Sequence, residues 1–344
     1  MSKFTPSSPS QECPVCGDIS GKCRHGDEIN LCMSFADVKL GEIINGYKVL
    51  KHSKDGMWAV LKLDNSQQWS DEQREQWRLD RERRKQQQKF ENDLRQQKSL
   101  SATEKDEEYR KLLDELTLHP EDEKELLRRG FTHREIKLGG WKSVDRYQEL
   151  RQKYSNLLPG ISPDGNAILT NSGWLCPVRN KDGLIVSIQV RLRVVPIGEG
   201  RYRWLSSRTK KNPNGQSPHV YPLGANDGEL PLACFYPEGE PKGIALAEGV
   251  GAKPFYVANR LGMLTLGAAG GQWASSPMTF KESLDHFSEK MDGLKELTIY
   301  VDAGDCVNKL VIDRWEKTVE LLEEWGWTVH IRPLAKKFCG ILGS

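Results

Sequence analysis

Two short apolar segments in the last third of the chain each end in a carboxylate beside a glycine. The first, I-A-L-A, ends at Glu248, and the second, L-T-I-Y-V, ends at Asp302, with Asp305 three residues later. Runs of this length and β-branched content are typical of buried strands. Ligands bind at the carboxyl ends of strands in an open parallel sheet, and carboxylate oxygens are the ligands that Mg²⁺ prefers. These residues therefore predict a magnesium or manganese site suited to phosphoryl chemistry.

Two roles are open for these carboxylates. Asp302 and Asp305 are placed to hold a metal that neutralises charge on a phosphoryl group, while Glu248 completes the coordination or acts as a general acid or base. The simpler alternative is that strand-end acids only cap helices or begin turns. Because three acids follow two strands of one α/β unit, the metal site is favoured. No complete G-x-x-x-x-G-K-[ST] phosphate loop occurs in the chain, which argues against an ATP-driven helicase.

Half of the eight cysteines lie in one short segment, at Cys13, Cys16, Cys23 and Cys32. Thiolates are the ligands that zinc favours in tetrahedral structural sites, and C-P-V-C has the spacing of a zinc knuckle. In a reducing compartment, clustered cysteines are more typical of metal sites than of disulfides. Cys23 and Cys32 lie further apart than a usual second pair, and His25 competes as a ligand. We predict structural zinc; a redox or unliganded cluster is the alternative.

Basic residues are concentrated between residues 179 and 211, where only two acids occur. Tyr202 and Trp204 alternate with arginines, so strand periodicity predicts aromatic and cationic side chains on opposite faces. Cations on phosphates and rings on bases are what single-stranded nucleic-acid binding uses. A charged edge strand over core aromatics is the alternative. The candidate nucleic-acid-binding residues are Arg191, Arg193, Arg201, Arg203, Lys210 and Lys211.

The elements that position these residues belong to several domains. The 344 residues are 37% hydrophobic and 28% charged with a net charge of +2, so a nucleic-acid preference has to come from local patches. The predicted division is a zinc-binding module with short strands (1–64), a charged helical linker (65–105), a small helical region (106–158), a β-rich basic lobe (159–240), an α/β domain (241–335) and a tail (336–344).

Strands and helices alternate in the α/β domain. The predicted strands are 244–247, 263–266, 297–301 and 328–332, and the predicted helices are 255–260, 279–291 and 307–325. This alternation is typical of a doubly wound parallel sheet. Upstream, N-K-D-G between two apolar runs predicts a hairpin, and helices are expected over 70–98, over 108–116, from Pro120 and from Thr132.

No apolar stretch is long enough to span a bilayer, and the first residues lack the apolar core of a signal peptide. We therefore expect a cytoplasmic protein without a membrane partner.

With its E-G after one strand and paired aspartates after another, the chain resembles the Toprim domain of topoisomerases and primases. It also resembles the catalytic core of bacterial DnaG-type primases. W-L-C-P-V-R-N-K-D-G-L-I-V-S-I-Q-V-R is similar to a hairpin of that core, Y-R-W-L-S-S to its basic strand, and M-L-T-L-G-A-A to a later Toprim segment. The resemblance implies an α/β multidomain protein in which a Toprim-like, Rossmannoid parallel sheet follows a β-rich lobe, a helical linker and an N-terminal zinc-binding module.

More closely, C-P-V-C-G-D-I-S-G-K-C-R and V-D-A-G-D-C-V-N resemble Toprim proteins of cyanobacterial plasmids and mobile elements. The resemblance implies a primase that makes primers on single-stranded DNA from nucleotides, with structural Zn²⁺ and catalytic Mg²⁺ or Mn²⁺. The resemblance is also compatible with a separately encoded replicative helicase as a partner. The alternatives are a non-catalytic DNA-binding initiator on a Toprim scaffold and a metal-dependent Toprim nuclease.

Two features depart from the family pattern. The usual Toprim pair is D-x-D, whereas Asp302 and Asp305 are separated by two residues. The extra residue changes the direction of the second carboxylate, so Glu248 and Asp302 are stronger candidates than Asp305. The zinc site of the family usually includes a histidine and paired knuckles, which keeps His25 in competition with the cysteines.

Overall fold

The computed structural model describes residues 4–26, 28–36, 38–53, 57–64, 71–195, 200–209, 212, 214–221, 228–301 and 309–334. The chain divides into two compact units, Met1–Gln87 and Gln88–Ser344, and the boundary falls within a long helix. The finer six-part division predicted above stays a prediction. No helix among the described residues is both long enough and apolar enough to cross a bilayer.

The first unit contains a six-stranded sheet with the order β1-β2-β3-β6-β5-β4. Its strands are β1 (Thr5–Pro6), β2 (Arg24–His25), β3 (Asn30–Cys32), β4 (Ile43–Ile44), β5 (Tyr47–His52) and β6 (Ala59–Leu63). Three of the four clustered cysteines lie in its small core, beside Val49 and Leu61. Because the apolar core is this small, the thiols are a large part of what holds the unit together.

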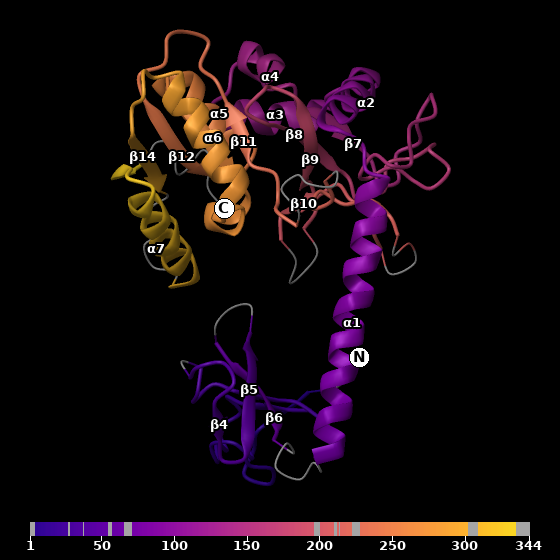
Figure 1. The fold of residues 1–344 in the computed structure, drawn as a ribbon, viewed down its shortest axis with the longest axis vertical. Helices are drawn as coiled ribbons and strands as arrows, with labels where there is room; N and C mark the ends of the chain where they lie inside the picture. The colour runs from indigo at the N-terminus through magenta and orange to yellow at the C-terminus, as the bar shows by residue number, and fades with distance from the viewer. Residues whose placement is uncertain are drawn as a thin grey trace. The chain divides into compact units, whose positions relative to one another are not determined.

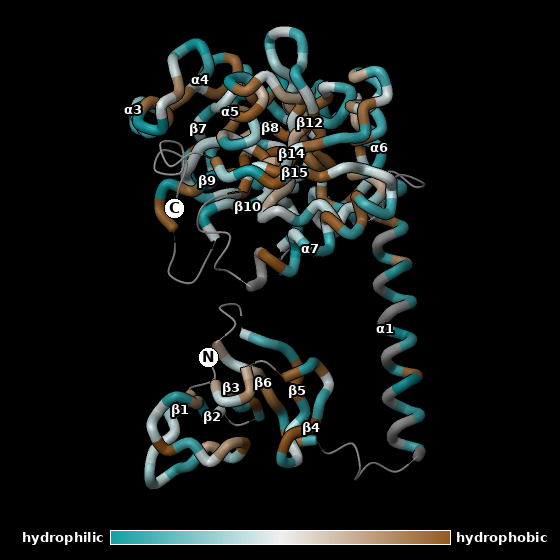
Figure 2. Tube along the Cα trace, turned by 90° about the vertical axis from the view of Figure 1, so that its left-hand side faces the viewer, coloured by the Kyte–Doolittle hydropathy of each residue, from teal (hydrophilic) through white to brown (hydrophobic). Residues whose placement is uncertain are grey.

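The helix that joins the units, α1 (Asp71–Gln97), confirms the helix predicted over residues 70–98. Its residues are almost all glutamine, glutamate, arginine, lysine and aspartate, and it is one continuous helix of 27 residues, labelled in Figure 1. Figure 2 shows α1 mostly in the hydrophilic colour, whereas hydrophobic residues gather among the strands of the second unit. A helix without a continuous apolar face is expected to be solvated.

Three short helices follow, and sequence signals account for where each begins. They are α2 (Ala102–Glu115), α3 (Pro120–Arg128) and α4 (His133–Gly139). α2 and α4 begin with capping boxes, Ser101 with Glu104 and Thr132 with Glu135, which satisfy backbone N–H groups that the first turn leaves open. Pro120 occupies the first turn of α3. The predicted starts at residues 120 and 132 are confirmed.

A four-stranded antiparallel sheet lies next in the chain, with the order β10-β9-β8-β7. Its strands are β7 (Lys142–Val144), β8 (Gly173–Arg179), β9 (Ile185–Leu192) and β10 (Tyr202–Trp204). The predicted hairpin is confirmed, since β8 and β9 are joined at N-K-D-G, where Gly183 has a φ of 79°. Tyr109 and Leu112 of α2 pack on one face of this sheet, against Leu175 and Ile188. We call this sheet and α2 to α4 the lobe.

The last sheet has five strands in the order β11-β13-β12-β14-β15. They are β11 (Ala233–Phe235), β12 (Ile244–Glu248), β13 (Leu264–Ala268), β14 (Glu296–Val301) and β15 (Thr328–Pro333), with helices α5 (Ala252–Leu261), α6 (Pro277–Glu289) and α7 (Lys309–Glu324). All four strands and three helices predicted here are present. β11 pairs antiparallel with β13, so this sheet also takes in a strand from the segment predicted as β-rich lobe.

The strand order creates a switch point between β12 and β14. The chain passes from β12 to β13 on one side, then crosses to β14 on the other side, and all of these pairs are parallel. In doubly wound sheets, ligands bind outside the carboxyl ends of the strands at such a point. Phe280 of α6 and Trp315 of α7 pack on one face, and Val257 of α5 packs on the other.

Helix α5 is also buried on its outer side, against the lobe. Phe255 contacts Trp141 and Phe131 on the side of the lobe, with ring centroids 5.1 and 6.0 Å away, and Phe235 of β11 at 6.4 Å. At the end of the helix, Arg260 is paired with Glu135 of α4 at 2.7 Å. The α5 helix therefore joins the five-stranded sheet to the lobe and sets how the two face each other.

We predict that Phe255→Ala destabilises the protein by about 3–5 kcal/mol, because it removes a buried ring and leaves a cavity. Phe90→Ala is the matched control, since Phe90 on α1 is 59% exposed whereas Phe255 is 4% exposed. We expect the control to change the free energy of unfolding by less than about 0.5 kcal/mol. Urea unfolding followed by circular dichroism measures both, and equal effects would contradict this role of α5.

Candidate functional site

A cavity of about 400 Å³ lies at the carboxyl ends of β12 and β13. It is lined by Arg129, Gln189, Arg201, Tyr202, Glu248, Gly249, Val250, Gly251, Ala252, Lys253, Pro254, Ala269 and Gly270. Glu248 is the last residue of β12, and the backbone of Gly249 turns with a φ of 94° to donate a hydrogen bond to Ala268 at the end of β13. The predicted glutamate is therefore located at the expected end of the sheet, in a cavity.

Glu248 is paired with Lys253 from the first turn of α5, at 3.5 Å between Oε2 and Nζ. The side chains are 30% and 12% exposed, respectively. α5 has no side-chain cap, and its first residues line the cavity. The open N–H groups of a helix start and its dipole both favour negative charge. This wall therefore combines a carboxylate with groups that attract an anion.

The loop after β13 forms another part of the wall through the short 3-10 helix η2 (Ala269–Gly271). Gly270 has a φ of 59°, and its carbonyl accepts a hydrogen bond of 3.1 Å from Arg314 of α7. A Cβ on Gly271 would lie 3.9 Å from Cγ of Glu248, which shows how closely this loop passes the carboxylate. The loop is thus hydrogen-bonded to α7 on one side and passes close to Glu248 on the other.

The lobe supplies the opposite wall, with Arg129 from the end of α3, Gln189 from β9, and Arg201 and Tyr202 at the start of β10. Among the lining residues that the structure describes, three are cationic and one is a carboxylate. An excess of cations in a concave site attracts anionic ligands. Arg201 and Tyr202 both line this cavity, and the placement of cations and aromatics on opposite strand faces stays a prediction.

The predicted partners of Glu248 follow the neighbouring strand. β14 ends at Val301, one residue beyond Tyr300, which pairs with Ala247 of β12. Asp302 and Asp305 come next in the chain and lie outside the described residues. Their convergence on Glu248 stays a prediction.

The candidate nucleic-acid-binding residues lie in different surroundings. Arg191 stacks on Trp174 with its Cζ 4.2 Å from the ring centroid, and Arg193 is paired with Asp122 at 2.8 Å. Arg203 is exposed and lies opposite Val190 in the sheet. Lys210 and Lys211 lie outside the described residues. Among the four candidates that the structure describes, Arg201 is the one that lines the cavity, and a nucleic-acid role for all six stays a prediction.

Two cavity residues, Arg129 and Lys253, are not identified by sequence reasoning. The spacing of Lys253 from Glu248, in E-G-V-G-A-K, is the available signal, but it does not complete a phosphate-loop motif. Arg129 lies 119 positions before Glu248 in the chain (248 minus 129) within a charged helix end, and no local pattern separates it from Arg128. Cys176 has no predicted role, and burial raises the pKa of its thiol to about 12, as expected for an inert core residue.

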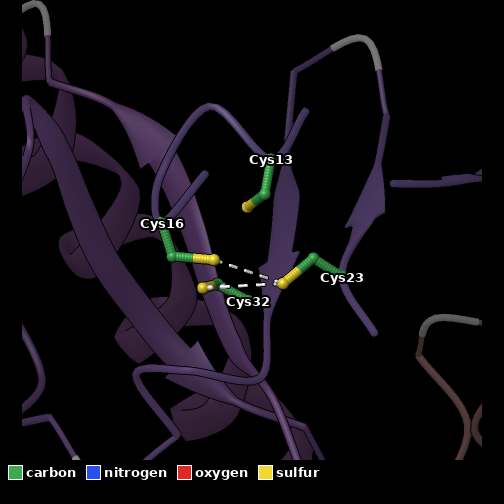
Figure 3. Close-up of side chains that lie close together, drawn as sticks. All are labelled: Cys13, Cys16, Cys23 and Cys32. Carbon is green, nitrogen blue, oxygen red and sulfur yellow. Dashed lines mark hydrogen bonds between the residues drawn. The ribbon is translucent and has the colours of Figure 1, made fainter. Parts of the chain in front are cut away.

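The four N-terminal cysteines converge, as predicted. Their sulfur atoms all lie within 4.8 Å of one another, and Figure 3 shows the side chains of Cys13, Cys16, Cys23 and Cys32 pointing toward a common centre. Tetrahedral zinc with Zn–S bonds of about 2.3 Å places sulfurs about 3.8 Å apart. The Sγ atoms of Cys16 and Cys23 are 3.6 Å apart, and those of Cys23 and Cys32 are 3.8 Å apart. The cluster therefore fits structural zinc.

Strand register explains the unusual spacing of the second cysteine pair. β2 and β3 pair antiparallel, with Arg24 opposite Leu31, and the residues that adjoin this pair, Cys23 and Cys32, have their Sγ atoms 3.8 Å apart. A hairpin thus replaces the second knuckle. His25 faces Asn30 one step inward and is not part of the metal-ligand cluster found among the described residues.

The fold is similar to solved structures of DnaG-type primase catalytic cores. One is a DnaG catalytic core, at 12% identity and a TM-score of 0.38, which covers 63% of this chain and 65% of that one. Another is a DnaG primase catalytic domain bound to ssDNA, at 11% identity and a TM-score of 0.42, which covers 68% and 72%. A third is the Aquifex aeolicus primase (zinc binding and RNA polymerase domains), at 14% identity and a TM-score of 0.42, which covers 69% and 56%.

No protein-family model and no curated protein matches this chain. At the identities and TM-scores of the solved structures, the likeness adds no weight to a function, which has to be inferred from the residues of the site.

We predict one zinc ion per chain, lost in Cys32→Ser and retained in His25→Gln, because the four thiols fit tetrahedral geometry without the histidine. Metal content by mass spectrometry measures this directly. Removal of zinc with a chelator is expected to unfold the first unit, since the thiols form much of its core. Loss of zinc in His25→Gln, with the fold intact by circular dichroism, would show that the ligand set is different.

Proposed function

We propose that this chain is a DnaG-like primase of a plasmid or mobile element, which synthesises primers on single-stranded DNA by metal-dependent nucleotidyl transfer. The observation that carries the proposal is the position of Glu248. It ends β12 at the switch point of a parallel sheet, beside the end of β14, in a cavity whose opposite wall is cationic. A carboxylate site facing a cationic wall is suited to ligands that combine metal ions with phosphates.

We further propose that the sheet is a Toprim domain and that Glu248, Asp302 and Asp305 hold Mg²⁺ or Mn²⁺. The oxygen donors fit such an ion. When bound, the metal would neutralise charge on the reacting phosphoryl group. Asp302 follows Val301, the last residue of β14, directly in the chain, whereas Asp305 comes three residues later, and this supports Asp302 as the nearer partner of Glu248.

The remaining cavity residues have roles that follow from their chemistry. Lys253 holds the carboxylate of Glu248 in place and supplies a positive charge for a phosphate. Arg201 and Tyr202 offer a cation and a ring from one edge of the lobe, a combination that suits a nucleotide or a base of single-stranded DNA. The zinc module would help to select the template. A cytoplasmic location and a separate helicase partner are parts of the same proposal.

We predict that the chain makes primers on single-stranded DNA with nucleoside triphosphates and Mg²⁺ or Mn²⁺. Asp302→Ala and Glu248→Gln should each lower the rate by at least about 100-fold, because loss of a metal ligand removes several kcal/mol of charge stabilisation. Asp285→Ala is the matched control, since Asp285 is an exposed carboxylate on α6 that pairs with Lys281. Gel analysis of labelled primers measures all three variants.

The same preparations separate the alternatives. Metal-dependent cleavage of DNA without nucleotides would identify a nuclease. Salt-sensitive DNA binding that needs no metal and yields no primer would identify a non-catalytic initiator. Product undiminished by Asp302→Ala would show that the metal site is elsewhere.

A further inference from the structure

Arg129 occupies an unusual place for a charged residue. It caps the end of α3 in the lobe, yet it lines the cavity that contains Glu248. It is only 3% exposed. An arginine is rarely buried this deeply unless its charge is used or balanced. The groups that balance the positive charge of Arg129 therefore help to show what the cavity binds.

One carboxylate, Glu125, serves three arginines. It accepts hydrogen bonds from Nε of Arg128 at 2.7 Å, from Nε of Arg129 at 2.9 Å and from a terminal nitrogen of Arg191 at 3.3 Å. The hydrogen bond from Arg128, followed by that from Arg129, holds the pKa of Glu125 down to about 2, so this carboxylate stays ionised. Three positive charges thus share one negative charge.

The indole ring of Trp174 packs against the guanidinium groups of two of these arginines. The guanidinium of Arg191 lies 4.2 Å from the ring centroid and that of Arg129 lies 5.5 Å from it. The ring stabilises both cations through its π face but brings no negative charge. Nε of Arg191 is buried without a hydrogen-bond partner among the described residues. Among the residues that the structure describes, the cluster therefore keeps an excess of positive charge next to the cavity.

Of the three arginines, only Arg129 reaches the cavity lining. A guanidinium has five N–H donors, and Glu125 receives the one on Nε of Arg129. Across the cavity, Lys253 and the start of α5 also favour an anion. Planar guanidinium forks match phosphate oxygens in both geometry and charge.

We propose that Arg129 binds a phosphate group of the ligand in the Glu248 cavity, and that Glu125 and Trp174 are positioning residues that hold its guanidinium for this contact. The inference rests on the proposed function in that the ligand would be the polyphosphate of an incoming nucleotide. Backbone phosphates of single-stranded DNA carry the same chemistry. The nucleotide is favoured because Arg129 is nearly excluded from solvent. A phosphate reaches it inside a cavity rather than on an exposed surface.

Arg128 provides a matched control. It neighbours Arg129 in the chain and bonds the same carboxylate, but its side chain is 63% exposed and does not line the cavity. A general effect of removing positive charge or of freeing Glu125 should appear in both variants. A phosphate contact in the cavity should appear in Arg129 variants alone.

The experiment is calorimetric titration of ATP and of inorganic tripolyphosphate, without divalent metal, into the full chain and its variants. Arg129→Gln should weaken both ligands about tenfold or more, as expected for loss of a charge-assisted hydrogen bond. Arg129→Lys should lie between Arg129→Gln and the unaltered chain, because it keeps the charge and loses the fork. Arg128→Gln should stay within about twofold. Equal affinities of Arg129→Gln and the unaltered chain would overturn the proposal.

A short oligothymidylate distinguishes the source of the phosphate. If Arg129→Gln weakens the oligonucleotide and leaves ATP and tripolyphosphate unchanged, the nucleotide assignment is overturned. Should Arg129→Gln fail to fold by circular dichroism, Arg129→Lys decides, because it keeps the charge and loses only the fork. Arg129→Lys should then bind tripolyphosphate more weakly than the unaltered chain, and equal affinities would overturn the contact.

These titrations measure binding without turnover, so their result does not depend on whether the chain makes primers. A chain that binds ATP through Arg129 and makes no primer would refute the primase and keep the phosphate contact. A chain that makes primers undiminished by Arg129→Gln would keep the primase and remove the contact.

Discussion

The burial of α5 on two sides is the interaction on which the site depends. One side of this helix covers β12 and β13, and the other packs its aromatic residues against the lobe. Apolar burial has no direction, but rings that meet edge to face leave little room for sliding. Because α5 begins shortly after Glu248, fixing the helix also fixes the carboxylate, the cationic start of the helix, and the wall of the lobe that faces them.

The same packing explains how charge is distributed around the cavity. The face of the antiparallel sheet opposite α2 is not wholly apolar, since Trp174 supports two arginines there, and Glu125 is their shared counter-ion. Such a cluster costs desolvation energy, and replacing buried ion pairs by apolar residues is often neutral for stability. A protein that keeps three arginines on one carboxylate beside a cavity gains little stability from them. This is the pattern expected of a site built for an anion.

The first unit depends on a different constraint. Its sheet has short strands and a small apolar core, so the four clustered thiols, three of them in that core, need a common partner to be stable as thiolates. The hairpin between β2 and β3 brings Cys23 and Cys32 together at the distance that a tetrahedral ion requires. The pairing of β2 with β3, rather than the number of residues between Cys23 and Cys32, therefore forms this half of the zinc site.

The local elements, and the residue types that could do chemistry, follow from the amino-acid sequence alone. Apolar runs predict the parallel strands, and cap residues predict the helix starts. The place of Glu248 at the end of an apolar run, and the clustering of the four cysteines, are equally visible in the chain. These signals are local, because strand period, capping and ligand type act within a few residues.

Which charges meet is a matter of tertiary structure. Folding places Arg129 in the cavity wall, stacks Arg191 on Trp174 and pairs Arg193 with Asp122, although all three look alike as basic residues in the sequence. The reason is physical: the role of a cation depends on its exposure and on the partners that folding brings from distant parts of the chain. Periodicity along one strand carries no information about those partners.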